Sequence, residues 1–234
     1  MPTPSISRVK EVFEQWAMYD AVVQNDYMHH KEIVAALAER VGELKQPLRI
    51  IDLGCGDTGL ATNAFRNANV ERYRGVDLSE SAIERARNFL ACWPGRAEAV
   101  AGNLVEFVAA VPDLSANVVL ASYSLHHFAT AQKIALVNHC YRILAPGGIF
   151  FWIDAVRDEN DTRDSYLARL TSVMQNDWTG LSAEQRARGV DHVLESDFPE
   201  TGSWMLDQVA HAGFKLGEPL FTDEFFSGWA FVKG

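Results

Sequence analysis

The sequence predicts an α/β fold in which helices cover both faces of a mostly parallel sheet. Apolar runs alternate with helical patterns between residues 48 and 153, and this alternation is typical of parallel strands joined by right-handed crossovers. Three of the runs end in an aspartate, namely Asp52, Asp77 and Asp154. The first run opens directly into a glycine-rich turn, the arrangement that brings backbone N–H groups and a helix N-terminus up to a ligand.

Composition limits the size of the fold and the kind of partner. The chain has 234 residues, of which 48% are hydrophobic, enough for one large domain, or one domain with a cap, around a packed core. Its 21 Lys and Arg residues are outnumbered by 31 Asp and Glu residues, which gives a net charge of −10. Because phosphate backbones and anionic membranes are bound by concentrated Lys and Arg, we expect neither a nucleic-acid nor a membrane partner.

The cysteine pattern and the lack of an apolar signal-peptide segment indicate the cellular compartment. Cys55, Cys92 and Cys140 are isolated in the sequence, which fits a reducing environment better than a disulfide framework or a zinc ribbon. No signal-peptide core is visible at the start, and no apolar run approaches the roughly 18 residues of a membrane span. We therefore expect a cytoplasmic protein.

Residues 1–46 are expected to form a helical cap on a sheet domain that covers residues 47–234. Residues 7–19 place apolar side chains on one helical stripe, and residues 29–41 do so again. The pattern then breaks, and the first strand begins at Leu48.

Strands of the sheet domain appear as short apolar runs, and helices as apolar residues three or four positions apart. Ser81 and Glu84 match a capping box at a helix start, and Pro146 marks a helix end. The run at 117–122 is apolar enough to be a central strand. The expected elements after the first strand are a helix start at 60–67, a strand at 72–77, a helix ending near Cys92, strands at 97–101 and 117–122, a helix at 131–144 and a strand at 149–153.

The alternation stops between residues 155 and 200. This segment is polar, has a helical tendency, and is longer than an ordinary connection between strands. We expect it to be a lid or substrate-binding insertion. A helix at 201–212 and two strands at 213–216 and 225–232 complete the chain.

The glycine loop indicates the class of ligand. Gly54, Gly56 and Gly59 fit the dinucleotide pattern G-x-G-x-x-G, so a nicotinamide-dependent oxidoreductase is one interpretation. Asp52, two residues before the first glycine, argues against it, because a carboxylate there repels a pyrophosphate. A ligand with an ammonium and a sulfonium group and no phosphate is compatible, and S-adenosylmethionine (SAM) is such a ligand.

Four segments in this order resemble the class I SAM-dependent methyltransferases: DLGCG at 52–56, GVDLS at 75–79, SYSLHH at 122–127 and LAPGG at 144–148. The resemblance is close over residues 48–155 and looser over the last two strands. It implies a Rossmann-like sheet of seven strands with an antiparallel last strand, and SAM as cofactor. It also implies methyl transfer to a small-molecule acceptor with release of S-adenosylhomocysteine.

Nine residues in or after the first four strands are predicted to contact the cofactor. The Asp77 carboxylate suits the paired ribose hydroxyls, Asn103 suits the adenine amine, and Asp52 suits the methionine ammonium. Helix capping by Asp77, a turn at Asn103 and loop orientation by Asp52 are the structural alternatives. The complete set is Asp52, Gly54, Gly56, Asp77, Leu78, Asn103, Leu104, Ser122 and Tyr123.

Candidate catalytic residues flank this cofactor site. His126 and His127 follow the fourth strand, near the crevice where open α/β sheets bind ligands, and an imidazole can accept the proton of an acceptor hydroxyl or amine. Loop bonding and packing would equally explain the pair. Tyr19, in preference to Tyr27 or His30, is expected to close over the cofactor.

Asp154, Trp178 and His192 are candidate substrate-pocket residues, together with Asp197. A surface charge network around one core tryptophan is the alternative. His126, Asp154 and His192 have no metal-ligand spacing, so no metal is expected. A non-catalytic SAM-binding module is a further interpretation, because no motif identifies the acceptor. The sequence does not indicate the oligomeric state either.

Overall fold

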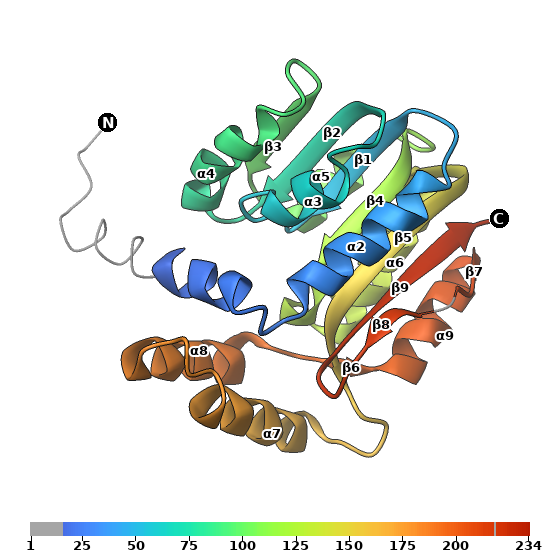
Figure 1. Ribbon diagram of the computed structural model, residues 1–234. Coiled ribbons are helices and arrows are strands. Elements are labelled where there is room, and N and C mark those ends of the chain that lie inside the picture. Colours follow the sequence, from blue (N-terminus) through green and yellow to red (C-terminus); the bar gives the residue numbers. More distant parts are fainter. Residues whose placement is uncertain (1–15, 218) are drawn as a thin grey trace.

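The computed structural model describes residues 16–217 and 219–234 and confirms the α/β class. Most of the helix expected at 7–19 lies outside the described residues, and residues 16–24 are helical. Figure 1 shows a twisted sheet between two helical layers, with further helices beyond one end of it. No helix in the described part of the chain is both long and apolar enough to cross a membrane.

The sheet follows the predicted topology with two short additions. The main path has seven strands in the order β3-β2-β1-β4-β5-β9-β7. β9 is antiparallel to β5, as expected for the last strand, whereas β1 to β5 pair in parallel. The strands are β1 Leu48–Leu53, β2 Val70–Asp77, β3 Ala97–Ala101, β4 Ala116–Ser122, β5 Leu144–Arg157, β7 Phe214–Lys215 and β9 Phe226–Lys233, with β6 Glu200–Thr201 beside β5 and β8 Pro219–Thr222 beside β9.

Helices cover both faces of the sheet. α2, α3 and α4 contribute to one buried apolar cluster, and α5, α6 and α9 contribute to a second, so α2 lies in front of the sheet and α6 behind it in Figure 1. These helices are α2 His30–Gly42, α3 Gly59–Ala64, α4 Glu80–Leu90, α5 Leu104–Ala110, α6 Thr130–Ile143 and α9 Gly202–Ala212, and the short 3-10 helix η1 spans Leu125–His127.

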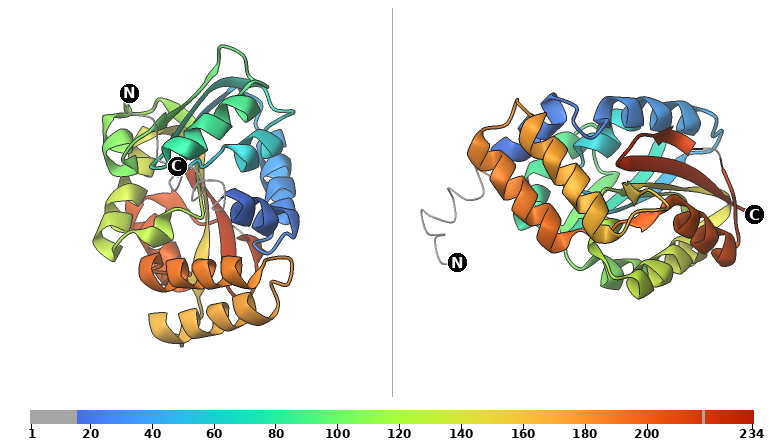
Figure 2. Two further views of the ribbon diagram at one scale, coloured as in Figure 1. Left: turned by 90° about the vertical axis from the view of Figure 1, so that its left-hand side faces the viewer. Right: turned by 90° about the horizontal axis from the view of Figure 1, so that it is seen from below.

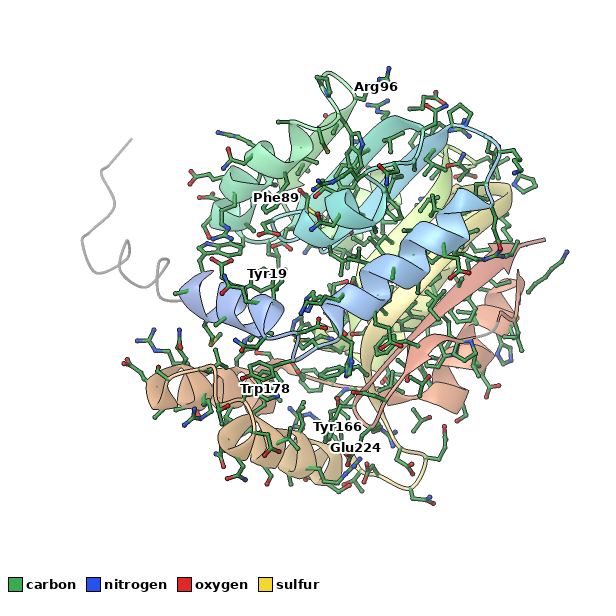
Figure 3. The ribbon with its side chains drawn as sticks, in the orientation of Figure 1. Tyr19, Phe89, Arg96, Tyr166, Trp178 and Glu224 are labelled. Carbon is green, nitrogen blue, oxygen red and sulfur yellow. The ribbon has the colours of Figure 1, made fainter. Side chains whose placement is uncertain are left out.

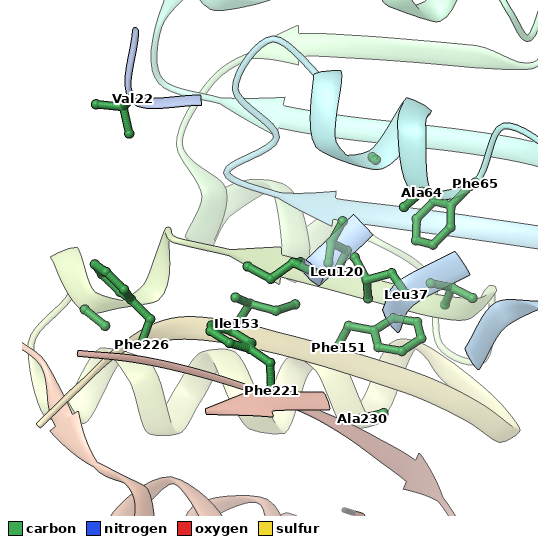
Figure 4. Close-up of a cluster of buried hydrophobic side chains, with 14 of the residues drawn as sticks. Val22, Leu37, Ala64, Phe65, Leu120, Phe151, Ile153, Phe221, Phe226 and Ala230 are labelled. Atoms are coloured by element: carbon green, nitrogen blue, oxygen red, sulfur yellow. The ribbon is translucent and has the colours of Figure 1, made fainter. Parts of the chain in front are cut away.

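The central position predicted for residues 117–122 is confirmed. β4 lies between β1 and β5, and successive side chains alternate between the two clusters, with Leu120 in the first and Val119 in the second. Figure 4 shows Leu120 among Ile153 and Phe151 of β5 and Leu37 of α2. Burial on both faces explains why this strand is a continuous apolar run.

The start of β5 and the presence of α5 differ from the expected elements for local reasons. β5 begins at Leu144, directly after α6, and the Pro146 turn lies inside the strand. The register between β4 and β5 shifts there, since Ala116 pairs with Leu144 whereas Val118 pairs with Ile149. α5 was not among the expected elements, and Asn103 begins it as N-cap.

The segment after β5 forms two helices, α7 Arg163–Asn176 and α8 Ala183–Ser196. Both views of Figure 2 show them side by side, beyond the end of β5. Buried side chains of both, such as Leu170 of α7 and Val190 of α8, belong to the same apolar cluster as α2. The insertion is therefore packed onto the domain.

Candidate functional site

A cavity of about 190 Å³ lies at the carboxyl ends of β1, β2 and β4. This is the edge where open parallel sheets bind ligands. Its walls come from the glycine loop, the strand ends and the segment that precedes β1. The lining residues are Tyr19, Met28, His30, Asp52, Gly54, Cys55, Gly56, Leu60, Ala61, Asp77, Leu120, Ser122 and Tyr123.

Gly54 and Gly56 of the loop are each required to be glycine, for different structural reasons. Gly54 has φ +74°, and a Cβ there would lie 2.3 Å from the Ser124 Cβ. The Ser124 hydroxyl donates to the Leu53 carbonyl at 2.7 Å, so the end of β4 holds the loop closely. Gly56 has φ +52° with open space in front of it. Its bare backbone faces the cavity, as a close ligand contact requires.

Asp52 is a buried carboxyl group at the floor of the cavity. It accepts a hydrogen bond from the Tyr73 hydroxyl at 2.6 Å, and within the described residues no cation pairs with it. Burial raises the pKa of Asp52 to about 7; the Tyr73 hydrogen bond opposes this rise, and the nearby Asp77 adds to it. A cationic ligand group would relieve this cost of ionisation.

Asp77 at the end of β2 connects the loop to the next helix. One carboxylate oxygen accepts from the Gly56 amide and the other from the Ser79 amide, each at 2.9 Å. Helix capping, the alternative considered for Asp77, is instead carried out by Ser79, whose hydroxyl accepts from the Ala82 amide. Each carboxylate oxygen can accept a second hydrogen bond, and Asp77 lines the cavity, so a ligand hydroxyl can still be bound.

Ser122 and Tyr123 close the cavity from β4. The Ser122 hydroxyl is buried and has no hydrogen-bond partner among the described residues, which leaves it available to a ligand. Tyr123 has φ +53°, and its hydroxyl donates to the Met28 carbonyl at 2.5 Å. This bond ties the end of β4 to the residues before α2.

Residues 16–24 carry Tyr19 over the cavity, and Figure 3 shows Tyr19 on the side that faces the sheet domain. Burial raises the pKa of Tyr19, so its hydroxyl stays protonated at neutral pH. Arg85 of α4 fixes the segment: its guanidinium lies 2.6 Å from the Asp20 carboxylate and 4.3 Å above the Trp16 ring.

His30 lines the cavity as well, although Tyr19 alone was expected to do so from the leading helices. The two rings meet edge to face with centroids 6.5 Å apart. Burial lowers the pKa of His30 to about 4, so the ring is neutral at pH 7. Its Nδ1 is buried and has no hydrogen-bond partner in the part of the chain that the structure describes.

Three predicted cofactor residues are absent from the lining of this cavity. Leu78 is 76% exposed, and Leu104 is buried in the second apolar cluster. The Asn103 side-chain oxygen accepts from the Val105 amide at 2.8 Å, as the N-cap of α5. Their contact with an adenine stays a prediction.

His126 and His127 lie outside the cavity lining. His126 is buried, and its Nδ1 is hydrogen-bonded to the Asp154 carboxylate. Burial alone would lower the pKa of His126, but the Asp154 charge and hydrogen bond raise it. His127 is partly exposed, and its Nδ1 lies 3.3 Å from the Asp197 carboxylate. The pair is thus joined to two aspartates from distant parts of the chain.

The predicted substrate-pocket residues occupy three different places. Asp154 is buried beside His126. Trp178 stacks on Tyr27 with centroids 4.9 Å apart, so it fastens the insertion to the leading helices. His192 lines a larger cavity of about 500 Å³ between residues 16–24 and α8. That cavity is the larger of the two, but the glycine loop does not reach it.

Sequence reasoning also missed Tyr73, which fixes Asp52. The parallel pairing of Asp52 with Gly75 places residue 73 two positions along the neighbouring strand on the same face. Once β1 and β2 are known to be adjacent, a tyrosine at that position is a recognisable partner for the buried acid.

Comparisons with known proteins agree with a ligand site at the carboxyl ends of these strands. Residues 50–148 match the model of a family described as a methyltransferase domain. A carboxy-S-adenosyl-L-methionine synthase of Aeromonas salmonicida is 28% identical over 193 residues, which are 79% of this chain and 76% of that protein.

Solved methyltransferase structures share the fold. An O-methyltransferase family protein from Burkholderia thailandensis matches with a TM-score of 0.65 at 17% identity, over 98% of this chain and 60% of that one. Human N-acetylserotonin methyltransferase in complex with SAM matches with a TM-score of 0.61 at 16% identity, over 95% of this chain and 55% of that one. Residues 50–148 thus form a methyltransferase domain, and the chain has the fold of solved SAM-dependent methyltransferases.

Proposed function

We propose that this enzyme transfers the methyl group of SAM to a small-molecule acceptor and releases S-adenosylhomocysteine. The observation that carries the proposal is the buried Asp52 without a cationic partner in the described structure, next to the open backbone of Gly56. An ammonium group bound there would neutralise the carboxylate, and the methionine half of SAM supplies one.

The rest of the cofactor extends from this point in the proposed complex. The Asp77 carboxylate accepts the ribose hydroxyls, and the unpartnered Ser122 hydroxyl lies near the methionine. A second cavity of about 190 Å³ shares Tyr19, His30 and Leu60 with the first. The rings of Tyr19 and His30 therefore lie between the two cavities, and a shift of Tyr19 would join the cavities into one longer site.

Methyl transfer requires above all that the acceptor atom, the methyl carbon and the sulfur lie in line. The acceptor's lone pair forms a bond to the methyl carbon while the carbon–sulfur bond breaks, and the sulfonium becomes a neutral thioether. Holding the three atoms in line is the main contribution of the protein, and exclusion of water by the cap assists it.

An acceptor hydroxyl or amine also loses a proton. Among the described residues, His30 is the histidine that lines the cavity; its ring is neutral at pH 7, and its Nδ1 has no hydrogen-bond partner there. We place it ahead of His126 and His127 as the proton acceptor. In single-turnover reactions, His30→Gln should slow methyl transfer with little change in SAM affinity, whereas replacement of an exposed histidine away from the cavity, His211→Ala, should leave the rate unchanged.

A calorimetric titration with S-adenosylhomocysteine tests the cofactor site, and acceptors are screened by release of that product. Binding by the parent that is lost in Asp77→Ala supports the proposal. Tight binding of NADH without binding of S-adenosylhomocysteine would contradict it.

The names of the relatives raise a second candidate, synthesis of carboxy-SAM. Its product carries an additional carboxylate, which calls for a cation near the transferred group. None of the described lining residues of this cavity is Lys or Arg, and Arg85 of the adjoining cavity is already paired with Asp20, which favours methyl transfer. Mass spectrometry of the nucleoside product distinguishes the two reactions.

The proposal includes a cytoplasmic location and no nucleic-acid or membrane partner. The net charge of −10 and the isolated cysteines support it. Cell fractionation and a filter-binding assay with DNA and RNA at low salt test it, and retention on either nucleic acid would contradict it.

A further inference from the structure

Three potential metal ligands meet where the insertion returns to the sheet domain. His126 and His127 belong to η1, directly after β4, and Asp197 is the C-cap of α8. One oxygen of Asp197 lies 3.5 Å from His126 Nε2 and 3.3 Å from His127 Nδ1. One ligand atom from each of the three residues fits within a group 4.8 Å across.

These separations match a tetrahedral metal. Zinc binds imidazole nitrogen and carboxylate oxygen at about 2.0–2.2 Å, so two ligands of one ion lie about 3.3 Å apart. Both distances from the Asp197 oxygen are already close to this value. The ligand atoms of the two histidines lie within 4.8 Å of each other, so they need to approach by at most about 1.5 Å to reach the tetrahedral separation.

Asp154 supplies the support that a metal-binding histidine requires. Its carboxylate is hydrogen-bonded to His126 Nδ1 and also accepts from the Trp152 indole at 2.9 Å. In the neutral ring, a proton held on Nδ1 leaves the lone pair on Nε2, on the side of Asp197. Metal-binding histidines commonly donate their second ring N–H to a carboxylate in this way.

A charged contact without a metal accounts less well for Asp197. The carboxylate is 5% exposed, and the oxygen that faces both histidines has no hydrogen-bond partner in the described structure. A buried, unpaired acceptor is costly, and coordination would satisfy it. His127 Nδ1 also lies 3.1 Å from the Ser196 carbonyl, so coordination would replace that contact.

We propose that His126, His127 and Asp197 bind one zinc ion, which fastens the end of α8 to the carboxyl end of β4. Two imidazoles and one carboxylate suit zinc, and water would take the fourth position. None of the three lines the cofactor cavity, so the ion positions the insertion and takes no part in methyl transfer. The proposal is independent of the acceptor.

The test uses the untagged full chain after treatment with a chelator. Titration with zinc sulfate should give one tight site by calorimetry and raise the melting temperature. Cobalt(II) at one equivalent should give the intense visible bands of a tetrahedral complex. Zinc should also slow proteolysis of the insertion.

Variants with matched controls assign the ligands. His127→Ala and Asp197→Asn should each weaken zinc binding on the order of 100-fold or more and abolish the cobalt bands. Asp154→Asn should weaken it about 10- to 100-fold, as loss of an outer-shell carboxylate does. The controls are the exposed His211→Ala and Asp191→Asn, which should bind zinc like the parent.

Two results would overturn the proposal. One is a parent protein that takes up no zinc at one equivalent. The other is uptake that survives unchanged in both His127→Ala and Asp197→Asn, since zinc would then be bound elsewhere. Because the partly exposed His127 makes little contribution to the core, a folding defect is not expected to obscure the comparison.

Discussion

Cofactor affinity should depend on pH through Asp52. Burial raises the pKa of Asp52 to about 7 in the free protein, and the proposed ammonium contact requires the ionised form. Half of the protein is then ionised at pH 7 and about one hundredth at pH 5. Affinity for S-adenosylhomocysteine should therefore fall about 50-fold from pH 7 to pH 5, or about 2.3 kcal/mol.

Isothermal titration calorimetry from pH 5 to pH 7 measures the affinity for S-adenosylhomocysteine. Repeating the titrations in buffers of different ionisation enthalpy gives the number of protons released on binding. About half a proton should leave per ligand bound at pH 7, and nearly one at pH 5. Asp52→Asn keeps an acceptor for the Tyr73 hydroxyl and should show weak, nearly pH-independent binding. A parent affinity that is flat over this range, or an Asp52→Asn variant with the parent's slope, would refute the reasoning.

Four further predictions concern stability and binding. The urea stability of the ligand-free parent relative to Asp52→Asn should fall as pH rises from 4 to 7, because folded Asp52 still holds a proton that the unfolded chain has released; the lowered pKa of His30 gives a slope of opposite sign that both proteins share. Asp77→Ala should weaken S-adenosylhomocysteine binding about 30- to 150-fold, the effect of ~2–3 kcal/mol of hydrogen bonds to a charged group. Gly54→Ala should cost at least about 2 kcal/mol more than Gly95→Ala, since both have positive φ but only the first would meet a neighbouring side chain; equal losses would contradict the packing argument. Trp178→Ala should lose about 3 kcal/mol in the same urea assay, because a buried stacked ring is removed.

The sequence was most informative where short-range patterns carry the information. The run that forms β4 is apolar because it is buried on both faces, and the glycine loop is visible because positive φ and close approach require glycine at positions 54 and 56. Asp52 and Asp77 were found because strand ends in a parallel sheet share one edge. All four of these residues line the cavity.

The parts that were missed depend on contacts between distant segments. His30 could be a solvated helix residue from its position in the sequence, and only the packing of α2 beside β4 places it at the cavity. Asp197 is 70 residues beyond His127 in the sequence, so no ligand spacing could reveal their grouping. Asn103 shows that a local contact can also be missed, since a turn was considered there but not the helix α5 that its side chain caps.

The division of the cavity walls indicates where acceptor specificity resides. The sheet domain supplies the groups proposed to bind the cofactor, Asp52, Asp77 and Ser122, whereas Tyr19 and His30 come from the segment before β1. That segment is held by the insertion, through the stacking of Tyr27 on Trp178, and by α4, through Arg85. A change in the insertion can therefore move the cap without touching a cofactor contact. Substitutions in the segment before β1 or in the insertion should therefore change which acceptor is methylated. Substitutions at the strand ends should change the affinity for the cofactor.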